Sequence, residues 1–555
     1  MRRSALVILS FFLAGLVPAQ RGDLYDLGTL HHFELTFKQL DWWQQLRGNY
    51  QTKTYIKADL NFSGRLYRDV GVRFRGNSTY RGLPPGSKKT PFKIKLDAFV
   101  PGQDLHGYDT LNLKNNLGDP SFVREVLGLS IFRRYGPAPR ANYVTLAING
   151  EDFGPYINIQ KINKDLQEQN GFSRDGNRYQ AERSVAVSND YSALIWLGND
   201  PAEYQKGFTL KTSPVKDSWT DLIRLCDVLN NTPIAQLPAK LPAVLDIDVA
   251  LRMLAVGNGM LWLDSYEGYG CRNYFLHQDA LHGRFVLMPW DADSSFGLYP
   301  DGLPDVTKVS PFRHQWNWRR PLLSRLLAIP AWHARYCAHI RTFLEEVMDW
   351  PRLEVQIRAL HALIDRANRK DPKRLYPPSM LKDSLTKSLD LGGTRVPGLK
   401  PVVEARRAYL LGRPEFRAAA PQLTNLQHAP AEPDEKATVT VTVRVGSSPA
   451  VAEVTLYHRT RGSFAQAPMF DDGRHGDGGS GDGLFGAFLP KVKAGTVVEY
   501  YVGAMTPRSS GGAMAFAPAT AGFRPPRFRI AYPRRITPIT INELLAKNVT
   551  GVKDQ

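Results

Sequence analysis

Cysteine is scarce in this sequence, and the 555 residues contain three of them: Cys226, Cys271 and Cys337. Three cysteines exclude a disulfide framework, and their odd number leaves at least one thiol unpaired. Stability must therefore come from ordinary hydrophobic cores. At about 100–200 residues per domain, the length predicts two to four domains, and 43% hydrophobic residues exclude a disordered chain.

Long apolar runs are also missing. Two arginines precede the apolar residues 5–16, which end at the small-residue pattern Val17-Pro18-Ala19. This pattern predicts that residues 1–19 are a secretory signal peptide. The run is shorter than the roughly 18 apolar residues of a membrane-spanning helix, and the most apolar later stretch, residues 250–263, contains Arg252. We therefore expect a secreted or cell-envelope protein with no transmembrane segment in the mature chain.

Acidic residues are fewer than basic ones, 53 against 71, which gives a formal net charge of +18. This charge favours anionic partners, such as acidic cell-surface polymers or phosphorylated ligands. Arginine is spread along the chain, and neither zinc-finger spacing nor an RNA-binding aromatic signature is present. We therefore expect no specific nucleic-acid partner.

Composition divides the chain into successive parts. Residues 23–413 mix helical and strand patterns, and residues 414–436, rich in Pro, Ala and Gln, are predicted to be a linker. Alternating apolar runs from Ala437 onward predict an immunoglobulin-like β-sandwich over residues 437–531. Residues 537–555 resemble the opening strand of a lamin-tail type domain, which would leave the chain truncated inside a domain. The expected fold class is α+β, followed by an all-β sandwich.

Two predicted strands, residues 70–75 and 92–96, alternate apolar and basic side chains. Since neighbouring strand residues point to opposite faces, the apolar set can enter a core while the basic set forms one cationic face. The basic set is Arg73, Arg75, Lys93 and Lys95. This face is either a solvated outer surface or a phosphate-binding surface. Small residues after Arg75, in Gly76-Asn77-Ser78, would let backbone N–H groups approach an anion.

A helix is predicted between Asp119, as its cap, and Tyr135. One face carries Phe122, Val126 and Leu129 at helical spacing. Glu125 flanks this face, and we interpret it as an ordinary exposed helix residue. The alternative is a pairing with a strand lysine, which would place Glu125 beside the phosphate-binding cations.

Carboxylates and a carboxamide stand at the ends of a predicted hairpin. A buried helix over residues 249–263 leads to Asp264, Asn273 precedes the first strand, and Asp291 and Asp293 follow the second. Hard oxygen ligands on a stiff hairpin suit Mg²⁺ or Mn²⁺. The segment therefore predicts a metal-nucleotide site.

Phosphoryl transfer needs a carboxylate for the hydroxyl proton, oxygen ligands for the metal, and cations for the phosphates. We assign the proton-accepting role to Asp264, with Asn273 and Asp291 as metal ligands. Asp293 is either a second metal ligand or a turn residue. Lys93 or Lys95 would reach the phosphates.

Six short motifs occur in an order that resembles the CotH kinase family, named for a bacterial spore-coat protein. They are Arg75-Gly76-Asn77-Ser78, Pro91-Phe92-Lys93-Ile94-Lys95, Asn112-Leu113, Asp119-Pro120-Ser121, Ile148-Asn149-Gly150 and Pro289-Trp290-Asp291-Ala292-Asp293. The resemblance covers residues 33–416. It implies a two-lobed, atypical protein-kinase-like fold that binds ATP and Mg²⁺ and phosphorylates Ser or Thr on proteins. By motif position, Asp264 would be the catalytic-loop aspartate and Asp291 the metal aspartate that opens the activation segment. The residues that contribute to ATP binding would be Arg75, Lys93, Lys95 and Glu125.

Three functions stay open at this point. The first is an exported Ser/Thr protein kinase, and the second is a non-enzymatic surface adhesion or structural protein that uses a kinase-like scaffold. The third is a metal-dependent hydrolase with the same acids.

In the predicted sandwich, the Asp- and Gly-rich residues 471–483 are either a polar turn or a Ca²⁺ site. We interpret Trp316, Trp318, Arg319 and Arg320 as packing and rim residues rather than an acceptor-binding patch.

Overall fold

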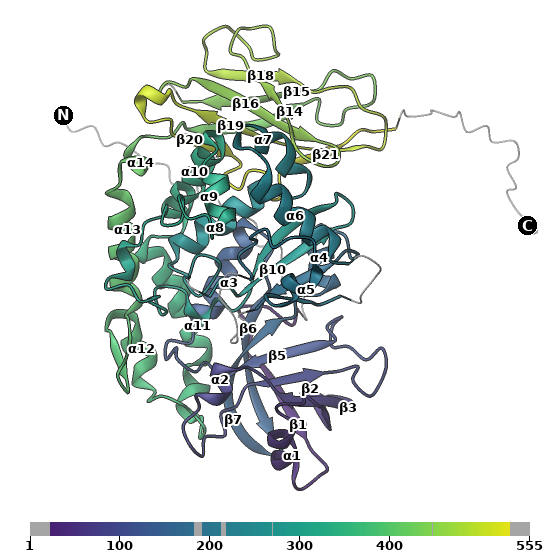
Figure 1. Ribbon diagram of the computed structural model, residues 1–555, viewed down its shortest axis with the longest axis vertical. Helices are drawn as coiled ribbons and strands as arrows, with labels where there is room; N and C mark the ends of the chain where they lie inside the picture. The colour runs from purple at the N-terminus through teal and green to yellow at the C-terminus, as the bar shows by residue number, and fades with distance from the viewer. Residues whose placement is uncertain (1–22, 183–190, 213–217, 269, 447, 533–555) are drawn as a thin grey trace, which may run out of the picture.

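The computed structural model describes residues 23–182, 191–212, 218–268, 270–446 and 448–532. A barrel lies at one end of the long axis, a mainly helical region in the middle, and a β-sandwich at the other end (Figure 1). The predicted signal peptide and residues 537–555 lie outside the described residues. Within the described part of the chain, no helix is both long and apolar enough to cross a bilayer.

The N-terminal part is a closed barrel in which β1 pairs with β2 on one side and, in parallel, with β6 on the other. The short helices α1 (Trp42–Gly48) and α2 (Ser78–Arg81) lie in its connections. In spatial order the strands are β1 (His31–Thr36), β2 (Ile56–Phe62), β3 (Arg65–Phe74), β4 (Phe92–Lys95), β5 (Thr110–Lys114), β7 (Glu151–Gln160) and β6 (Ala141–Ile148).

The alternation in β3 and β4 produces the predicted division into two faces. The apolar set is fully buried in the barrel core: Val72, Phe74, Phe92, Ile94 and Leu96. The two strands pair antiparallel with Arg73 opposite Lys93, so the predicted cationic face is confirmed. Asn149 and Gly150, at φ angles of 50° and 79°, form the tight turn between β6 and β7, as expected for an Asn-Gly hairpin.

Helix α3 (Arg124–Tyr135) begins four residues later than predicted. Phe122 has a φ angle of 59°, which breaks the helical backbone before Val123. Asp119 still stabilises the start of the helix, because its carboxylate accepts the backbone N–H of Arg124 at 3.1 Å and pairs with that residue's guanidinium at 2.6 Å. The predicted apolar face is confirmed as buried. Helix α3 packs on both β6 and α8, and so joins the barrel to the helical region.

The middle region combines helices with a small antiparallel sheet in the order β11-β10-β8-β9. The sheet contains β8 (Arg178–Ala181), β9 (Phe208–Leu210), β10 (Tyr274–Asp279) and β11 (Arg284–Pro289). A separate hairpin joins β12 (Leu389–Leu391) to β13 (Thr394–Val396). The helices are α4 (Lys164–Gln169), α5 (Pro201–Gln205), α6 (Thr220–Asn231), α7 (Leu237–Lys240), α8 (Ile247–Gly259), α9 (Pro321–Leu327), α10 (Pro330–Glu346), α11 (Trp350–Lys370), α12 (Ser379–Thr386), α13 (Leu399–Leu411) and α14 (Pro414–Arg417).

Helix α8 is the predicted apolar helix, and nearly all of its residues are buried. It ends four residues earlier than predicted, and Leu261, just beyond its end, has a φ angle of 57°. The β10–β11 hairpin is confirmed, with Tyr274 paired to Pro289 at its open end. The residues before β10 and after β11 therefore leave the hairpin side by side.

The C-terminal part is a sandwich of two sheets. One sheet has the order β14-β15-β18, with β14 (Leu423–Ala429), β15 (Thr440–Val445) and β18 (Leu484–Phe488). The other is built from β17 (Ala465–Pro468), β16 (Glu453–Arg459), β19 (Val497–Met505), β20 (Met514–Ala517) and β21 (Arg527–Arg529). Both α14 and β14 lie within residues 414–436, the predicted linker. The sandwich therefore starts earlier than the alternation from Ala437 indicates.

The sandwich packs directly on α8 and α10 through a buried ionic network. Asp248 lies 2.5 Å from Arg252, 2.8 Å from Arg335 and 3.1 Å from His339. Arg335 also donates to the Tyr501 hydroxyl on β19 at 2.8 Å. Charges buried in this way are stable only when each has a partner, so the network ties β19 to the helical region.

Candidate metal and anion site

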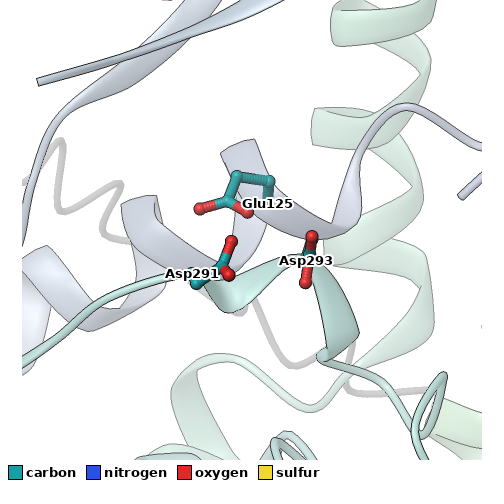
Figure 2. Close-up of side chains that lie close together, drawn as sticks. All are labelled: Glu125, Asp291 and Asp293. Carbon is teal, nitrogen blue, oxygen red and sulfur yellow. The ribbon is translucent and has the colours of Figure 1, made fainter. Parts of the chain in front are cut away.

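Four charged side chains from three segments meet between the barrel and the β10–β11 hairpin. The ammonium of Lys114, at the end of β5, lies 2.6 Å from Glu125 on α3 and 2.7 Å from Asp293, and it also donates to Asp291. Glu125, Asp291 and Asp293 each offer a carboxylate oxygen within 4.8 Å of the others. Figure 2 shows the three carboxylates turned toward one another.

Local backbone geometry aims the two aspartates at this point. Asp291 follows β11 with a φ angle of 61°, a left-handed conformation that costs energy for any residue with a side chain. The backbone N–H of Ala292 donates to Glu125 at 3.2 Å, and the Trp262 indole donates to the Asp291 carbonyl at 3.2 Å. These bonds hold the turn, so the hairpin end and α3 are fixed relative to each other.

The cluster is closed on one side and open on the other. The side chains of Lys114 and Glu125 are 5% and 0% exposed, whereas those of Asp291 and Asp293 are 38% and 26% exposed. Solvent therefore reaches the aspartates, and hard carboxylate oxygens in this number fit Mg²⁺ or Mn²⁺. Asp291 and Asp293 are the residues that could hold such an ion.

The close approach of these charges shifts their pKa values in opposite directions. Burial acts to raise the pKa of Asp291, but the neighbouring Lys114 ammonium outweighs it and holds that pKa below its usual value. Burial and the Asp291 charge raise the pKa of Asp293 to about 8, despite Lys114. Burial likewise raises the pKa of Glu125, although Lys114 opposes it. The raised pKa values of Asp293 and Glu125 mean that their charged forms are disfavoured beside Asp291, and a bound cation would stabilise those charged forms.

Asp264 and Asn273 form the neighbouring part of the site. The Asn273 amide donates to the Asp264 carboxylate at 3.1 Å and to its carbonyl at 2.7 Å, and Arg272 pairs with that carboxylate at 2.5 Å. Burial raises the pKa of Asp264, Arg272 opposes the shift, and the nearby Asp291 charge adds to it. The charges of Asp264 and Asp291 therefore interact, and the sharing of one metal ion by these residues stays a prediction.

A basic cavity of about 950 Å³ adjoins the cluster. Its lining includes Arg73, Arg75 and Lys93 from the barrel, together with Lys161 and Trp290. Burial, together with the neighbouring charges of Arg73 and Arg75, lowers the pKa of Lys93 to about 7. Burial also lowers the pKa of Arg75, while Asp291 and Glu125 act to raise it. Crowded cations of this kind favour a polyanionic ligand.

The predicted site residues are not all brought to one place. Arg75 and Lys93 line the cavity, and Glu125, Asp291 and Asp293 share Lys114. Lys95 is absent from the described residues that line the cavity, and its ammonium lies 3.6 Å from Asp97 with the side chain 36% exposed. The expected roles of these residues in binding and catalysis stay predictions.

One sequence interpretation is wrong, and one residue of the site was not predicted. Glu125 was expected to be an exposed helix residue, which is wrong: it is fully buried and paired with a strand lysine. That lysine is Lys114, which the sequence analysis missed. The available signal was the alternation in Thr110-Leu111-Asn112-Leu113-Lys114, where the polar residues occupy one face of a strand that runs toward α3.

The acidic loop of the sandwich is organised by its own backbone. Asp477 accepts the N–H groups of Asp472, Gly473 and His475 at 2.6–2.8 Å. Asp471 accepts those of Gly481, Asp482 and Gly483 at 2.8–3.1 Å. These bonds account for the dense Asp and Gly pattern as a turn. Binding of Ca²⁺ there stays a prediction.

Comparison with known proteins identifies the region that holds this cluster. Residues 72–410 match the model described as CotH kinase protein, which covers more than half of the chain. The chain belongs to the CotH kinase protein family. Residues 423–506 match the second Ig-like domain of conditioned medium factor. The inner spore coat protein H of Bacillus subtilis (strain 168) is 24% identical over 313 residues, which is 55% of this chain and 79% of that protein.

The CotH region contains all the site residues described above, and the Ig-like match starts at β14 rather than at Ala437. Within the CotH region, a D-F-G triplet at Asp152-Phe153-Gly154 lies in β7 of the barrel. The candidate metal aspartate is instead Asp291, after β11. Short ordinary kinase signatures therefore do not locate the site in this chain. A mixed helix-and-sheet region followed by an all-β Ig-like part is confirmed, whereas the two-lobed kinase-like arrangement stays a prediction.

Proposed function

We propose that this protein is an exported Ser/Thr protein kinase that transfers the γ-phosphoryl group of ATP to protein hydroxyls with Mg²⁺ or Mn²⁺. One observation carries the proposal: a buried lysine, Lys114, joins a helix glutamate to two aspartates, and Trp290, the residue before Asp291, lines a basic cavity. A lysine–glutamate pair next to a metal-binding aspartate is the arrangement that protein kinases need for phosphoryl transfer.

The cavity side of the site would bind the triphosphate. Arg75 and Lys93 would neutralise phosphate oxygens, and Trp290 offers an aromatic wall to the nucleotide. Glu125 would orient the Lys114 ammonium toward the phosphates. Asp291 and Asp293, with Asn273 beside them, would hold the metal ion, whose positive charge offsets the charge on the transferring group.

Asp264 would act on the acceptor. Its carboxylate would take the proton of a Ser or Thr hydroxyl as that oxygen bonds to the γ-phosphorus and the bond from the γ-phosphorus to the bridging oxygen breaks. The raised pKa of Asp264 suits a group that must accept a proton. Asn273 and Arg272 hold the carboxylate in one orientation.

Family and chain organisation support the biological setting. The relative from Bacillus subtilis is named as an inner spore coat protein, so we place this chain in a comparable outer layer of a cell, or outside it. The Ig-like part would attach the CotH region to a surface, and the net charge of +18 would favour anionic polymers there.

The test is phosphate transfer from radiolabelled ATP with Mn²⁺ or Mg²⁺, alone and with casein as acceptor. We expect labelled casein or self-labelled protein, and no label with Asp291→Ala. Asp305→Ala is a matched control, because Asp305 pairs locally with Lys308 on the surface. A wild-type protein that transfers no label and shows no nucleotide-induced rise in melting temperature would contradict the proposal.

A second candidate is a non-enzymatic surface protein that uses the basic cavity as a binding site for anionic polymers. The Ig-like domain fused to the CotH region favours it. The same assay separates the candidates, because a binding protein would bind an acidic polymer without labelling any acceptor. A hydrolase would release free phosphate and label nothing.

A further inference from the structure

One sheet of the sandwich turns its outer face toward the helical region. In this sheet Tyr457 lies opposite Gln466 on β17 and Tyr501 on β19, and Glu453 lies opposite Met505. Paired residues share a face, as do residues two apart along a strand, so these five side chains lie on one face. The other face of the sheet forms the sandwich core. The outer face is itself apolar and aromatic over much of its area, and it packs on α10.

A cavity of about 520 Å³ remains between this outer face and the helical region. The five side chains just named line it, together with residues from the starts of α8 and α10. The Ig-like part and the CotH region therefore build it jointly, and we call it the interface cavity. Small-molecule sites are typically clefts of about 300–1,000 Å³ and often lie between domains. Among the described residues, the interface cavity shares none of its lining with the basic cavity, so the two are separate sites.

The charged residues that line the interface cavity balance one another. They are three arginines and three acids: Arg284, Arg335, Arg508, Asp246, Asp248 and Glu453. Arg335 pairs with Asp248 at 2.8 Å, and Arg284 lies 3.7 Å from Asp246. One exposed group of each sign remains beyond these pairs. A lining of this kind gives little net electrostatic attraction for an ion, and it favours an uncharged ligand.

Three polar side chains of the lining are available to a ligand. Glu453, Gln466 and Arg508 are exposed, and within the described part of the chain their side chains have no hydrogen bond or ion pair. A carboxylate accepts hydrogen bonds, a guanidinium donates them, and an amide does both. Because the two charges are exposed, an ion pair with either would contribute little. A ligand with several neighbouring hydroxyl groups, which both donate and accept, matches this set.

Aromatic side chains add an apolar surface to the same cavity. Trp332 on α10 and Phe464, just before β17, line it, and both are partly exposed. Phe464 is held by an edge-to-face contact with Tyr501 at 4.8 Å and by the Arg459 guanidinium, 4.2 Å from the ring centre. A ring fixed in this way offers a flat apolar surface at little entropic cost on binding. A ligand with C–H groups on its faces and hydroxyl groups at its edge fits both sets of side chains, and a sugar has this form.

We propose that the interface cavity is a binding site for a neutral saccharide. The site lies outside the phosphoryl-transfer cluster and does not depend on the proposed kinase function. It assigns a ligand to the junction of the CotH region and the Ig-like part, where bound sugar would contact both. Binding there would attach the protein to a glycan and hold its two parts together.

Binding is measured with the full chain by isothermal titration calorimetry, without nucleotide. The probes are the neutral disaccharides maltose, cellobiose and chitobiose, the anionic digalacturonic acid, and the zwitterionic dipeptide glycylglycine. We expect at least one neutral disaccharide to bind and neither charged probe to bind more tightly. If none of the three neutral sugars binds, or if digalacturonic acid or glycylglycine binds more tightly than all of them, the proposal is wrong.

Variants locate the binding. The double variant Phe464→Leu/Gln466→Ala removes the ring and the amide but keeps an apolar side chain, and it is expected to weaken sugar binding at least about tenfold. Arg508→Ala, at an exposed position, leaves no group in the protein without a partner and should weaken binding about threefold or more. Gln427→Ala, exposed on β14 of the other sheet, should bind as the wild type. A sugar affinity that is the same in the wild type, the double variant and Arg508→Ala would place the sugar elsewhere and overturn the proposal.

Discussion

Lys114 on β5 and Glu125 on α3 lie 2.6 Å apart, and both side chains are almost completely buried. The pair joins the barrel to the helix that packs on α8. Through the same ammonium it also joins both to Asp291 and Asp293. Removing one member of a buried ion pair costs about 3–5 kcal/mol, because the other charge is left without a partner. Lys114 therefore contributes both to the packing of the barrel against α3 and to the charge of the candidate site.

Lys114→Met should abolish phosphate transfer and lower the free energy of unfolding by about 3–5 kcal/mol, since three carboxylates lose their shared cation. Mn²⁺ should raise the melting temperature of this variant more than that of the wild type, because the ion can replace the missing ammonium. Lys95→Met is the matched control, from the neighbouring strand, and should behave as the wild type. A smaller Mn²⁺ effect in Lys114→Met would argue against a cation site here.

Asp291→Asn should reduce kcat at least about 100-fold by removing a negatively charged oxygen from the site. The rise in melting temperature with Mn²⁺ and ATP should disappear at the same time, which differential scanning fluorimetry can measure. Asp305→Asn, on the surface, should change neither quantity. Retention of the Mn²⁺ response in Asp291→Asn would show that the ion binds elsewhere.

Asp264→Asn should lower kcat by about 10²–10⁴, the usual contribution of a general base, while ATP affinity stays the same. Arg272→Ala should raise the pKa of Asp264, because the pairing guanidinium now opposes that shift. Since the base must be deprotonated, the acid limb of the pH–rate profile should move to higher pH. An unchanged acid limb would mean that Asp264 does not control the reaction.

The lowered pKa of Lys93 predicts that the stability of the protein depends on pH. Its pKa is about 7 in the folded protein, lowered first by burial, against 10.5 in an unfolded chain. Between these values the unfolded state holds a proton that the folded state lacks, so Lys93 makes stability rise with pH in this window. Below pH 7, Lys93 is charged in both states, and the folded protein bears the full free-energy cost of burying that charge.

Lys93→Met should therefore raise the melting temperature most below pH 7, and the gain should fade toward pH 10.5. The same variant should bind ATP more weakly near neutral pH, because a cation is lost from the cavity. Melting curves across this range and nucleotide titrations measure the two effects, with Lys95→Met as control. A gain that grows with rising pH would contradict the assignment.

Asp248→Ala tests the contact between the sandwich and the helical region. The change leaves Arg252 and Arg335 without their shared carboxylate, so urea-induced unfolding should show a loss of about 3–5 kcal/mol. Glu453→Ala, at an exposed position of β16 in the sandwich, should cost little. If the two variants unfold alike, the ionic network contributes no net stability at this contact.

Several elements were predictable because their signals are local. Alternation identified the core and basic faces of β3 and β4, and Asn149-Gly150 identified the β6–β7 turn. The apolar residues of α8 and the two strands of the acidic hairpin were also correct. In each case the preference arises within a few neighbouring residues, where backbone sterics and side-chain periodicity decide the conformation.

Other features depend on packing between distant segments. The parallel pairing of β1 with β6 closes the barrel across more than 100 residues of chain, and no local pattern encodes it. Asp119 is not the N-cap residue of α3, because Phe122 takes a left-handed backbone conformation and the helix starts after it. The segment around β14 appeared to be a linker because its exposed edge strand carries a weak apolar period.

The amino-acid pattern alone determined the apolar helix, the acidic hairpin and the cationic strand face, together with the resemblance to the CotH kinase family. Tertiary structure decided that Glu125 is buried, that Lys114 is its cation, and that Trp316 and Trp318, which were expected to pack, project from the surface. The physical reason is distance along the chain. Lys114 and Asp291 are 177 residues apart, so only the packing of α3 between the barrel and α8 brings their charges together.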